Sequence, residues 1–321
     1  MVIIQNRLII DNYSNFVKFS LSKYIWFDGK LVPLNMAKVP VTTHAIHYGT
    51  SIFEGIRAYW NPKNLYIFRL KDHIKRFRNS GKFYNITLNF SDKQIENAVI
   101  DLCRKNKIKK SCYIRPFYFV GQYGINLHVT KKAPTHTVIF AFPFGDLFNK
   151  NGITATISKW RKFNDTSTPT QAKMGGNYLN SILATQDAKQ KGFDEAVLLD
   201  QSGNVSEAPG ENIFLIKNDI MITPSLSSSA LDGITRKSII TIAKDMNLKI
   251  KIQKVSKKEL KLADEVFLSG TAAEITPILK IDKKKIGDGK VGNITKLFMD
   301  TYSDIVMNNN KNYSNWLTKV Y

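Results

Sequence analysis

Apolar segments of two kinds follow one another along this chain, and their irregular order constrains the fold more than any other feature. The runs at 113–120 and 137–144 are short, aromatic and β-branched, which is typical of buried strands. Helical spacing of apolar residues predicts a helix over 72–84, and the capping-box pair Ser91 and Gln94 predicts the start of a second helix. Strands and helices do not alternate in regular βαβ order, so we expect an α+β fold and not a doubly wound parallel sheet.

The length of 321 residues is enough for about two domains. We expect an irregular leader over 1–22, a small N-terminal α+β domain over 23–145, a linker over 146–152 and a larger C-terminal α+β domain over 153–321. Further predicted elements are a hairpin at 24–32, strands at 65–69, 153–160, 196–199, 213–216, 249–255 and 266–268, and helices at 177–191 and from residues 234 and 294.

Basic residues outnumber acidic ones by 47 to 26, which gives a formal net charge of +21. Such an excess suits a nucleic-acid-binding protein, but it also suits a lysine-rich surface that attracts anionic substrates. The basic residues are spread along the chain, and the densest groups lie at 107–110, 249–261 and 283–285. No nucleic-acid-binding motif accompanies them. We therefore predict no nucleic-acid partner and keep a nucleic-acid-binding protein as the alternative.

Neither a membrane span nor a secretion signal is expected. No run approaches the roughly 18 apolar residues that a membrane-spanning helix needs, and polar residues interrupt the apolar start, MVIIQNRLII. The two cysteines, Cys103 and Cys112, form neither a disulfide framework nor a zinc site. His44 and His47 have no third ligand at a recognisable spacing. We expect a cytoplasmic protein without a metal.

The segment 171–181, QAKMGGNYLNS, is the most informative part of the sequence. Lys173 precedes Gly175, Gly176 and the expected start of a helix. Glycine lets the backbone approach a ligand closely. A lysine in apolar, amide-rich surroundings can have a lowered pKa and form a Schiff base with a carbonyl group. For a single lysine the ordinary alternative is a solvated surface charge.

Three other clusters complement Lys173. Glu207, in SEAPGENIF, can place a carboxylate against the ring nitrogen of a pyridine cofactor, although two acids beside a turn commonly face solvent. The sequence SSSALDGITR leads directly into a helix, so the first N–H groups, at Ile234 and Thr235, would face an anion such as a phosphate. The segment SGTAAEITPI follows a strand and offers small residues and free N–H groups to a carboxylate or a phosphate oxygen.

The order of these motifs resembles the branched-chain amino acid aminotransferases, which belong to the fold type IV group of pyridoxal-phosphate enzymes. The matching segments, in chain order, are HAIHYGTSIFEGIRAY, YIRP, KMGGNYL, SEAPGENIF, ALDGITR and SGTAAEITP. The resemblance extends from about Tyr24 to beyond Thr295. It implies a two-domain α+β fold like that of D-amino acid aminotransferase, with pyridoxal 5′-phosphate as cofactor. The implied reaction is reversible transfer of the amino group between L-leucine, L-isoleucine or L-valine and 2-oxoglutarate, which gives branched 2-oxo acids and L-glutamate.

The resemblance also implies roles for single residues on the cofactor side. Lys173 matches the catalytic lysine, which carries the cofactor and later moves a proton. Glu207 matches the carboxylate on the ring nitrogen. The remaining cofactor-binding positions, which hold the ring, its oxygen and the phosphate, match Arg76, Tyr178, Leu231, Ile234, Thr235 and Thr271.

On the substrate side, Arg115 matches the residue that accepts the second carboxylate of glutamate. The groups that hold the substrate α-carboxylate match Tyr113, Thr271 and Ala272. The apolar side-chain pocket matches Phe53 and Phe144, with Tyr48 and Leu127 supplied by a partner subunit. The resemblance therefore implies a homodimer, and it leaves open whether dimers assemble further.

Two departures from the family pattern limit what can be carried over. Phe144 follows Pro143 where bacterial members have a tryptophan, which leaves the preference among leucine, isoleucine and valine open. The C-x-x-C pair of the animal enzymes is absent. D-amino acid aminotransferase, aminodeoxychorismate lyase and amine transaminase share the lysine and the acid and phosphate sites, but the segments EGIR and YIRP favour the L-branched-chain enzyme.

Overall fold

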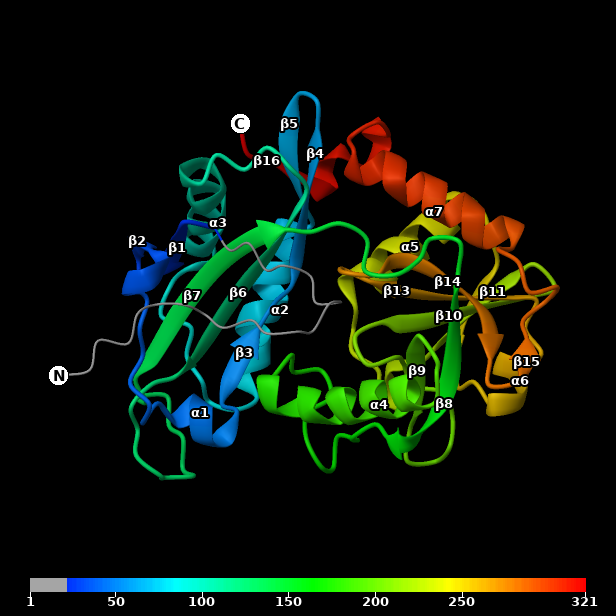
Figure 1. The fold of residues 1–321 in the computed structure, drawn as a ribbon, viewed down its shortest axis with the longest axis horizontal. Helices are drawn as coiled ribbons and strands as arrows, with labels where there is room; N and C mark the ends of the chain where they lie inside the picture. The colour runs from blue at the N-terminus through cyan, green and yellow to red at the C-terminus, as the bar shows by residue number, and fades with distance from the viewer. Residues whose placement is uncertain (1–21) are drawn as a thin grey trace.

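The computed structural model describes residues 22–321, so all but the last residue of the expected leader lies outside it. Two sheets lie side by side (Figure 1). Every strand pair of the first sheet is antiparallel within the described residues. Its strands in spatial order are β16 (Leu317–Lys319), β5 (Asn64–Phe68), β4 (Ile56–Asn61), β6 (Cys112–Val120), β7 (Thr135–Pro143), β1 (Tyr24–Phe27) and β2 (Lys30–Pro33), and β3 (Ser51–Phe53) pairs with β6.

The second sheet is mixed, because β12 joins β11, β14 joins β8 and β8 joins β9 in parallel. Its strands in spatial order are β12 (Ile250–Gln253), β11 (Ile220–Pro224), β10 (Asn212–Lys217), β13 (Glu265–Gly270), β14 (Glu274–Ile281), β8 (Ile153–Arg161) and β9 (Glu195–Leu199), and β15 (Lys284–Lys285) pairs with β14.

Helices α2 (Leu70–Lys82) and α3 (Asp92–Lys105) pack against the first sheet. The predicted capping box at the start of α3 is confirmed: the Gln94 N–H donates to Ser91 Oγ at 3.2 Å, and the Ser91 N–H donates to Gln94 Oε1 at 2.8 Å. Phe77 of α2 packs edge-on against Tyr118 of β6, with ring centroids 4.7 Å apart. This apolar packing fixes α2 on the sheet.

The remaining helices lie mostly around the second sheet (Figure 1). Those of ten or more residues are α4 (Tyr178–Gln190), α5 (Ile234–Asp245) and α7 (Asn293–Val306). The shorter ones are α1 (His44–Tyr48), which follows the first sheet's β2, and α6 (Lys257–Lys261). Short 3₁₀ segments are η1 (Leu34–Met36), η2 (Gly175–Asn177), η3 (Leu226–Ser228) and η4 (Lys311–Trp316).

The α+β fold predicted from the sequence is confirmed. The last strand, β16, however, lies in the first sheet and not in the second. β16 pairs with β5, and Val320 is buried in the core of the first sheet. The expected domain over 153–321 therefore needs a correction at its end, since these last residues join the first sheet. A buried cluster that contains Tyr59 and Phe68 together with Phe267 connects the two halves.

Candidate active site

The backbone around Lys173 is held by β3 of the first sheet and by helix α2. The Phe53 N–H donates to the Lys173 carbonyl at 3.1 Å, and the Lys173 N–H donates to Ser80 Oγ at 3.0 Å. Gly175 allows this close packing, because a Cβ atom at this position would lie 2.3 Å from Ser51 Oγ and would displace it. The close approach that we expected toward a ligand is thus made to strand β3 of the same chain. These contacts aim the lysine side chain into a cavity between the two sheets.

Lys173 Nζ donates a hydrogen bond to the Tyr178 hydroxyl at 2.6 Å. Burial, together with the positive charge of Arg76, lowers the pKa of Lys173 to about 8. Burial also raises the pKa of Tyr178 to about 12, so the phenol stays neutral at pH 7. The pair therefore brings a neutral phenol into contact with an amine that loses its proton close to neutral pH, as a nucleophilic lysine must.

Glu207 lies on one wall of this cavity, and neighbouring residues fix its carboxylate. Lys162 Nζ lies 2.6 Å from Glu207 Oε1. The Leu231 N–H and Asn212 Nδ2 donate to Oε2 at 2.9 and 3.1 Å. Burial works against the charge of Lys162, but the carboxylate raises the pKa of Lys162 above its ordinary value. The result is an oriented negative charge that can face a protonated ring nitrogen.

At the other end, the cavity offers donors suited to an anion. Helix α5 begins at Ile234 with Gly233 as an N-cap that makes no side-chain cap, and Arg76 lies beside this helix start. A Cβ atom on Gly233 would lie 1.9 Å from Asn212 Oδ1, so a larger residue would displace the Asn212 amide. Ser269 Oγ is buried and has no hydrogen-bond partner in the described part of the chain. Helix N–H groups, a guanidinium and an unpaired hydroxyl together fit a phosphate.

The aromatic wall of the cavity carries a second arginine. The guanidinium carbon of Arg115 lies 4.7 Å from the ring centroid of Phe53 and 5.2 Å from that of Tyr113. Arg115 Nη2 donates to the Tyr113 hydroxyl at 3.3 Å, and Arg115 Nε has no hydrogen-bond partner among residues 22–321. This cation therefore keeps hydrogen-bonding capacity for a carboxylate that enters the cavity.

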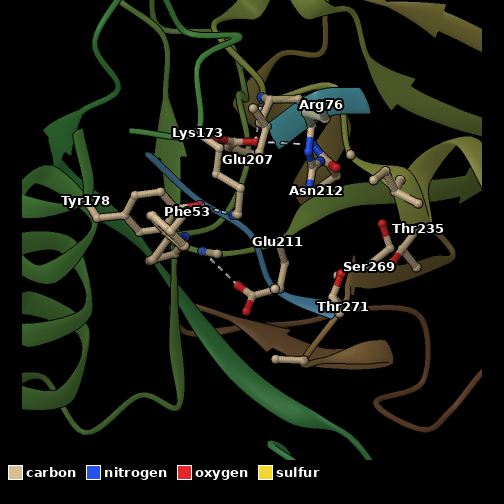
Figure 2. A pocket seen from close by; sticks show the side chains of 18 of the residues that line it. Phe53, Arg76, Lys173, Tyr178, Glu207, Glu211, Asn212, Thr235, Ser269 and Thr271 are labelled. Atoms are coloured by element: carbon tan, nitrogen blue, oxygen red, sulfur yellow. Dashed lines mark hydrogen bonds between the residues drawn. The ribbon is translucent and has the colours of Figure 1, made fainter. Parts of the chain in front are cut away.

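The structure brings most of the expected site residues to one cavity of about 190 Å³ (Figure 2). A cavity of this size admits a small molecule. The expected residues that line it are Phe53, Arg76, Tyr113, Arg115, Lys173, Tyr178, Glu207, Leu231, Ile234, Thr235, Thr271 and Ala272.

Three expected site residues do not line the cavity of the single chain. Tyr48 and Leu127 are exposed, which is compatible with a contribution to the cavity of a partner. Phe144 packs against Tyr113, with ring centroids 5.3 Å apart. Phe144 does not line the cavity of the single chain, and its place in the substrate pocket stays a prediction.

Several residues of the site were not anticipated from the sequence. Glu54, His73, Lys162 and Asn212 hold other residues of the site in place, and Ser269 adds a buried hydroxyl to the wall of the cavity. Among residues 22–321, no three histidine, cysteine, aspartate or glutamate side chains come together as metal ligands would. Within the same range no helix is long and apolar enough to cross a membrane.

Comparison with known proteins gives a consistent result. The family Amino-transferase class IV matches residues 51–281. The branched-chain-amino-acid aminotransferase of Salmonella typhimurium is 41% identical over 301 residues, which cover 92% of this chain and 97% of the relative. The probable branched-chain-amino-acid aminotransferase of Aquifex aeolicus is 41% identical over 305 residues, 93% of this chain and 97% of the relative.

Solved structures agree in fold. A branched-chain aminotransferase from Thermoproteus uzoniensis, crystallised with norvaline, superposes with a TM-score of 0.91 at 40% identity and covers 94% of this chain and 100% of its own. The T.th. branched-chain amino acid aminotransferase, complexed with N-(5′-phosphopyridoxyl)-L-glutamate, superposes with a TM-score of 0.90 at 39% identity, with 94% and 99% covered.

Proposed function

The chain belongs to the class IV aminotransferases, and we propose that Lys173 carries its pyridoxal 5′-phosphate and moves the proton during the reaction. The enzyme reversibly transfers the amino group between L-leucine, L-isoleucine or L-valine and 2-oxoglutarate. The observation that carries the role of Lys173 is its position. Lys173 has a pKa of about 8. It lines the same cavity as the fixed Glu207 carboxylate and the anion-binding donors at the start of α5.

The residues of the cavity fit the cofactor from end to end. Arg76, the first turn of α5, and the hydroxyl groups of Thr235 and Thr271 would hold the phosphate. Glu207 would face the ring nitrogen, Tyr178 the ring oxygen, and Leu231 a face of the ring. When bound, the cofactor supplies an electron sink for the bond broken at the substrate Cα. The chain supplies the proton transfer, through Lys173 as general base and acid.

For the substrate, we assign the α-carboxylate to the Tyr113 hydroxyl and the backbone at Thr271 and Ala272. A branched side chain would contact Phe53, whereas the second carboxylate of glutamate would meet Arg115. One cavity then binds both kinds of substrate. Arg115 lies over the rings of Phe53 and Tyr113, so an apolar side chain would contact the rings and a carboxylate would contact the guanidinium.

A homodimer is part of the proposal, and its support is an exposed apolar surface. Ile46 of α1 is 62% exposed, Ile125 and Leu127 are 78% and 76% exposed, and Leu179 of α4 is 65% exposed. α1 and α4 both lie along the lower edge of Figure 1. The Tyr48 hydroxyl donates to the Ile125 carbonyl at 3.3 Å, and this hydrogen bond joins α1 to the loop after β6.

Large exposed apolar patches mark contact surfaces, and a second copy here would supply Tyr48 and Leu127 to the cavity. Light scattering on the purified enzyme tests this, and a monomer with full activity would contradict it. A cytoplasmic location completes the proposal, and cell fractionation followed by activity assays tests it.

The catalytic role is tested with Lys173→Ala. The wild-type protein, loaded with pyridoxal 5′-phosphate, should show visible absorption from the lysine-bound cofactor, and the variant should lose that band. Turnover should fall by at least ~10²–10⁴-fold, the range for losing a general base. Lys159→Ala is the matched control, because Lys159 lies on β8 and is 67% exposed. An unchanged visible spectrum in Lys173→Ala would assign the cofactor to another lysine.

A further inference from the structure

Glu54 is a fully buried carboxylate that the proposed reaction does not use. It follows Phe53 at the end of β3, and its exposed fraction is 0%. Its backbone N–H donates to the Pro116 carbonyl at 2.8 Å, which fixes its position beside β6. A buried charge is tolerated only when its hydrogen-bonding capacity is met by partners. The partners of Glu54 therefore indicate its purpose.

One partner is local, since the Gly55 N–H donates to Glu54 Oε2 at 3.2 Å, and the others come from helix α2. Arg76 Nε donates to Glu54 Oε1 at 2.6 Å, and Arg76 Nη2 donates to Oε2 at 2.9 Å. His73 Nδ1 lies 2.7 Å from the same Oε2. Burial opposes ionisation of Glu54, but Arg76 and His73 hold the pKa of Glu54 well below its usual range. Because the carboxylate is ionised, His73 Nδ1 must carry the proton of this hydrogen bond and supports the carboxylate from its second side.

The two parallel hydrogen bonds fix the plane of the Arg76 guanidinium. A guanidinium has five N–H groups, and this fork uses one on Nε and one on Nη2. Nη1 donates to the Asp232 carbonyl, directly before the start of α5, at 3.3 Å. The N–H groups that remain are on Nη1 and Nη2, at the edge opposite Nε, and Arg76 lines the cavity (Figure 2).

We propose that Glu54, supported by His73, is a positioning residue that aims the free edge of Arg76 at the cofactor phosphate. Without the carboxylate, the arginine side chain would lose the two bonds that fix its orientation. The inference rests on the proposed role of Arg76 in phosphate binding. It adds that phosphate binding depends on Glu54, which contacts the Nε edge of Arg76 and not the free edge that would meet the phosphate.

The test compares two ligands that differ only in the phosphate. Apoenzyme is titrated with pyridoxal 5′-phosphate and with pyridoxal, and both dissociation constants are measured by fluorescence or absorbance. In Glu54→Gln, the dissociation constant for pyridoxal 5′-phosphate should rise on the order of 10–100-fold, as for partners that orient a metal ligand. The dissociation constant for pyridoxal should stay unchanged. Asp72→Asn is the matched control, because Asp72 is an acid on the same helix that pairs with Arg69 and does not contact Arg76.

The outcomes separate this inference from the proposed function. An equal loss for both ligands would show that Glu54 only stabilises the fold, and no loss for either would also overturn the inference. If wild-type apoenzyme did not prefer the phosphorylated ligand, the role of Arg76 itself would be wrong. Glu54→Asp keeps the charge but shortens its reach by one methylene, so it provides the same comparison if Glu54→Gln does not fold.

Discussion

Replacing Arg115 with methionine should separate the two substrates of this enzyme. The change roughly keeps the length of the side chain and removes its charge. Leucine offers nothing for the guanidinium to bind, whereas glutamate and 2-oxoglutarate carry a second carboxylate. We therefore expect the half-reaction with L-leucine to survive and the half-reaction with 2-oxoglutarate to fall sharply.

The structure sets the size of the effect. Arg115 is half-buried between Phe53 and Tyr113, and its guanidinium has no carboxylate partner within the described residues. Losing one partner of a hydrogen-bonded charge pair costs about 2–5 kcal/mol. Because Arg115 is only half-buried, we expect a cost at the lower end of this range. A cost of about 2 kcal/mol corresponds to about a 30-fold loss in the half-reaction with 2-oxoglutarate.

Single-turnover measurements of each half-reaction provide the assay, since they follow binding and chemistry for one substrate at a time. Arg161→Met is the matched control, because Arg161 is an exposed arginine at the end of β8. Equal losses in both half-reactions, together with a lower melting temperature, would refute the reasoning and make Arg115 a structural residue.

Three further changes test other parts of the site. Glu207→Gln should retain the cofactor through Arg76 and α5 but reduce turnover on the order of a hundredfold, because an amide cannot stabilise a protonated ring nitrogen as a carboxylate does; full kcat at full cofactor content would exclude this role. The rate of cofactor uptake by apoenzyme should rise with pH and level off above about 8, because only the deprotonated Lys173 amine is nucleophilic; a continued rise toward pH 10 would indicate an ordinary lysine. Gly55→Ala would place a Cβ atom 1.7 Å from the Tyr113 hydroxyl, so it should raise KM for leucine and glutamate together while cofactor binding persists; unchanged KM values would remove Tyr113 from the α-carboxylate site.

Elements with a continuous local signal were predicted well from the sequence. β6 and β7 are rich in aromatic and β-branched residues, and the capping box of α3 is a local pattern. β14 was missed, because SGTAAEITPI was interpreted as a ligand-binding segment after a strand and not as a strand itself. In the structure Pro277 is paired with Phe267 of β13, and the register shift toward β8 comes just after it. That arrangement depends on tertiary pairing, which no local pattern encodes.

The residues of the candidate site also divide into those with a local sequence signal and those without one. Lys173 and Glu207 lie in segments of unusual composition, so sequence analysis could single them out. Glu54 is a single acid in an apolar stretch, and its function arises only when α2 is packed beside the end of β3. Its one signal in the sequence is that it is the single acid in the mostly apolar segment SIFEGIRAY.

The return of the chain to its first sheet has a consequence for synthesis on the ribosome. The Tyr321 N–H donates to Asn64 Oδ1, a contact between residues 257 positions apart. Until residues 317–319 leave the ribosome, one edge of β5 has no strand beside it, although Leu65 and Ile67 are fully buried in the finished protein. Unpaired apolar edges are templates for wrong pairing. The first sheet is therefore complete only after the second half has been made, and until then this edge of β5 is open to pairing with another chain.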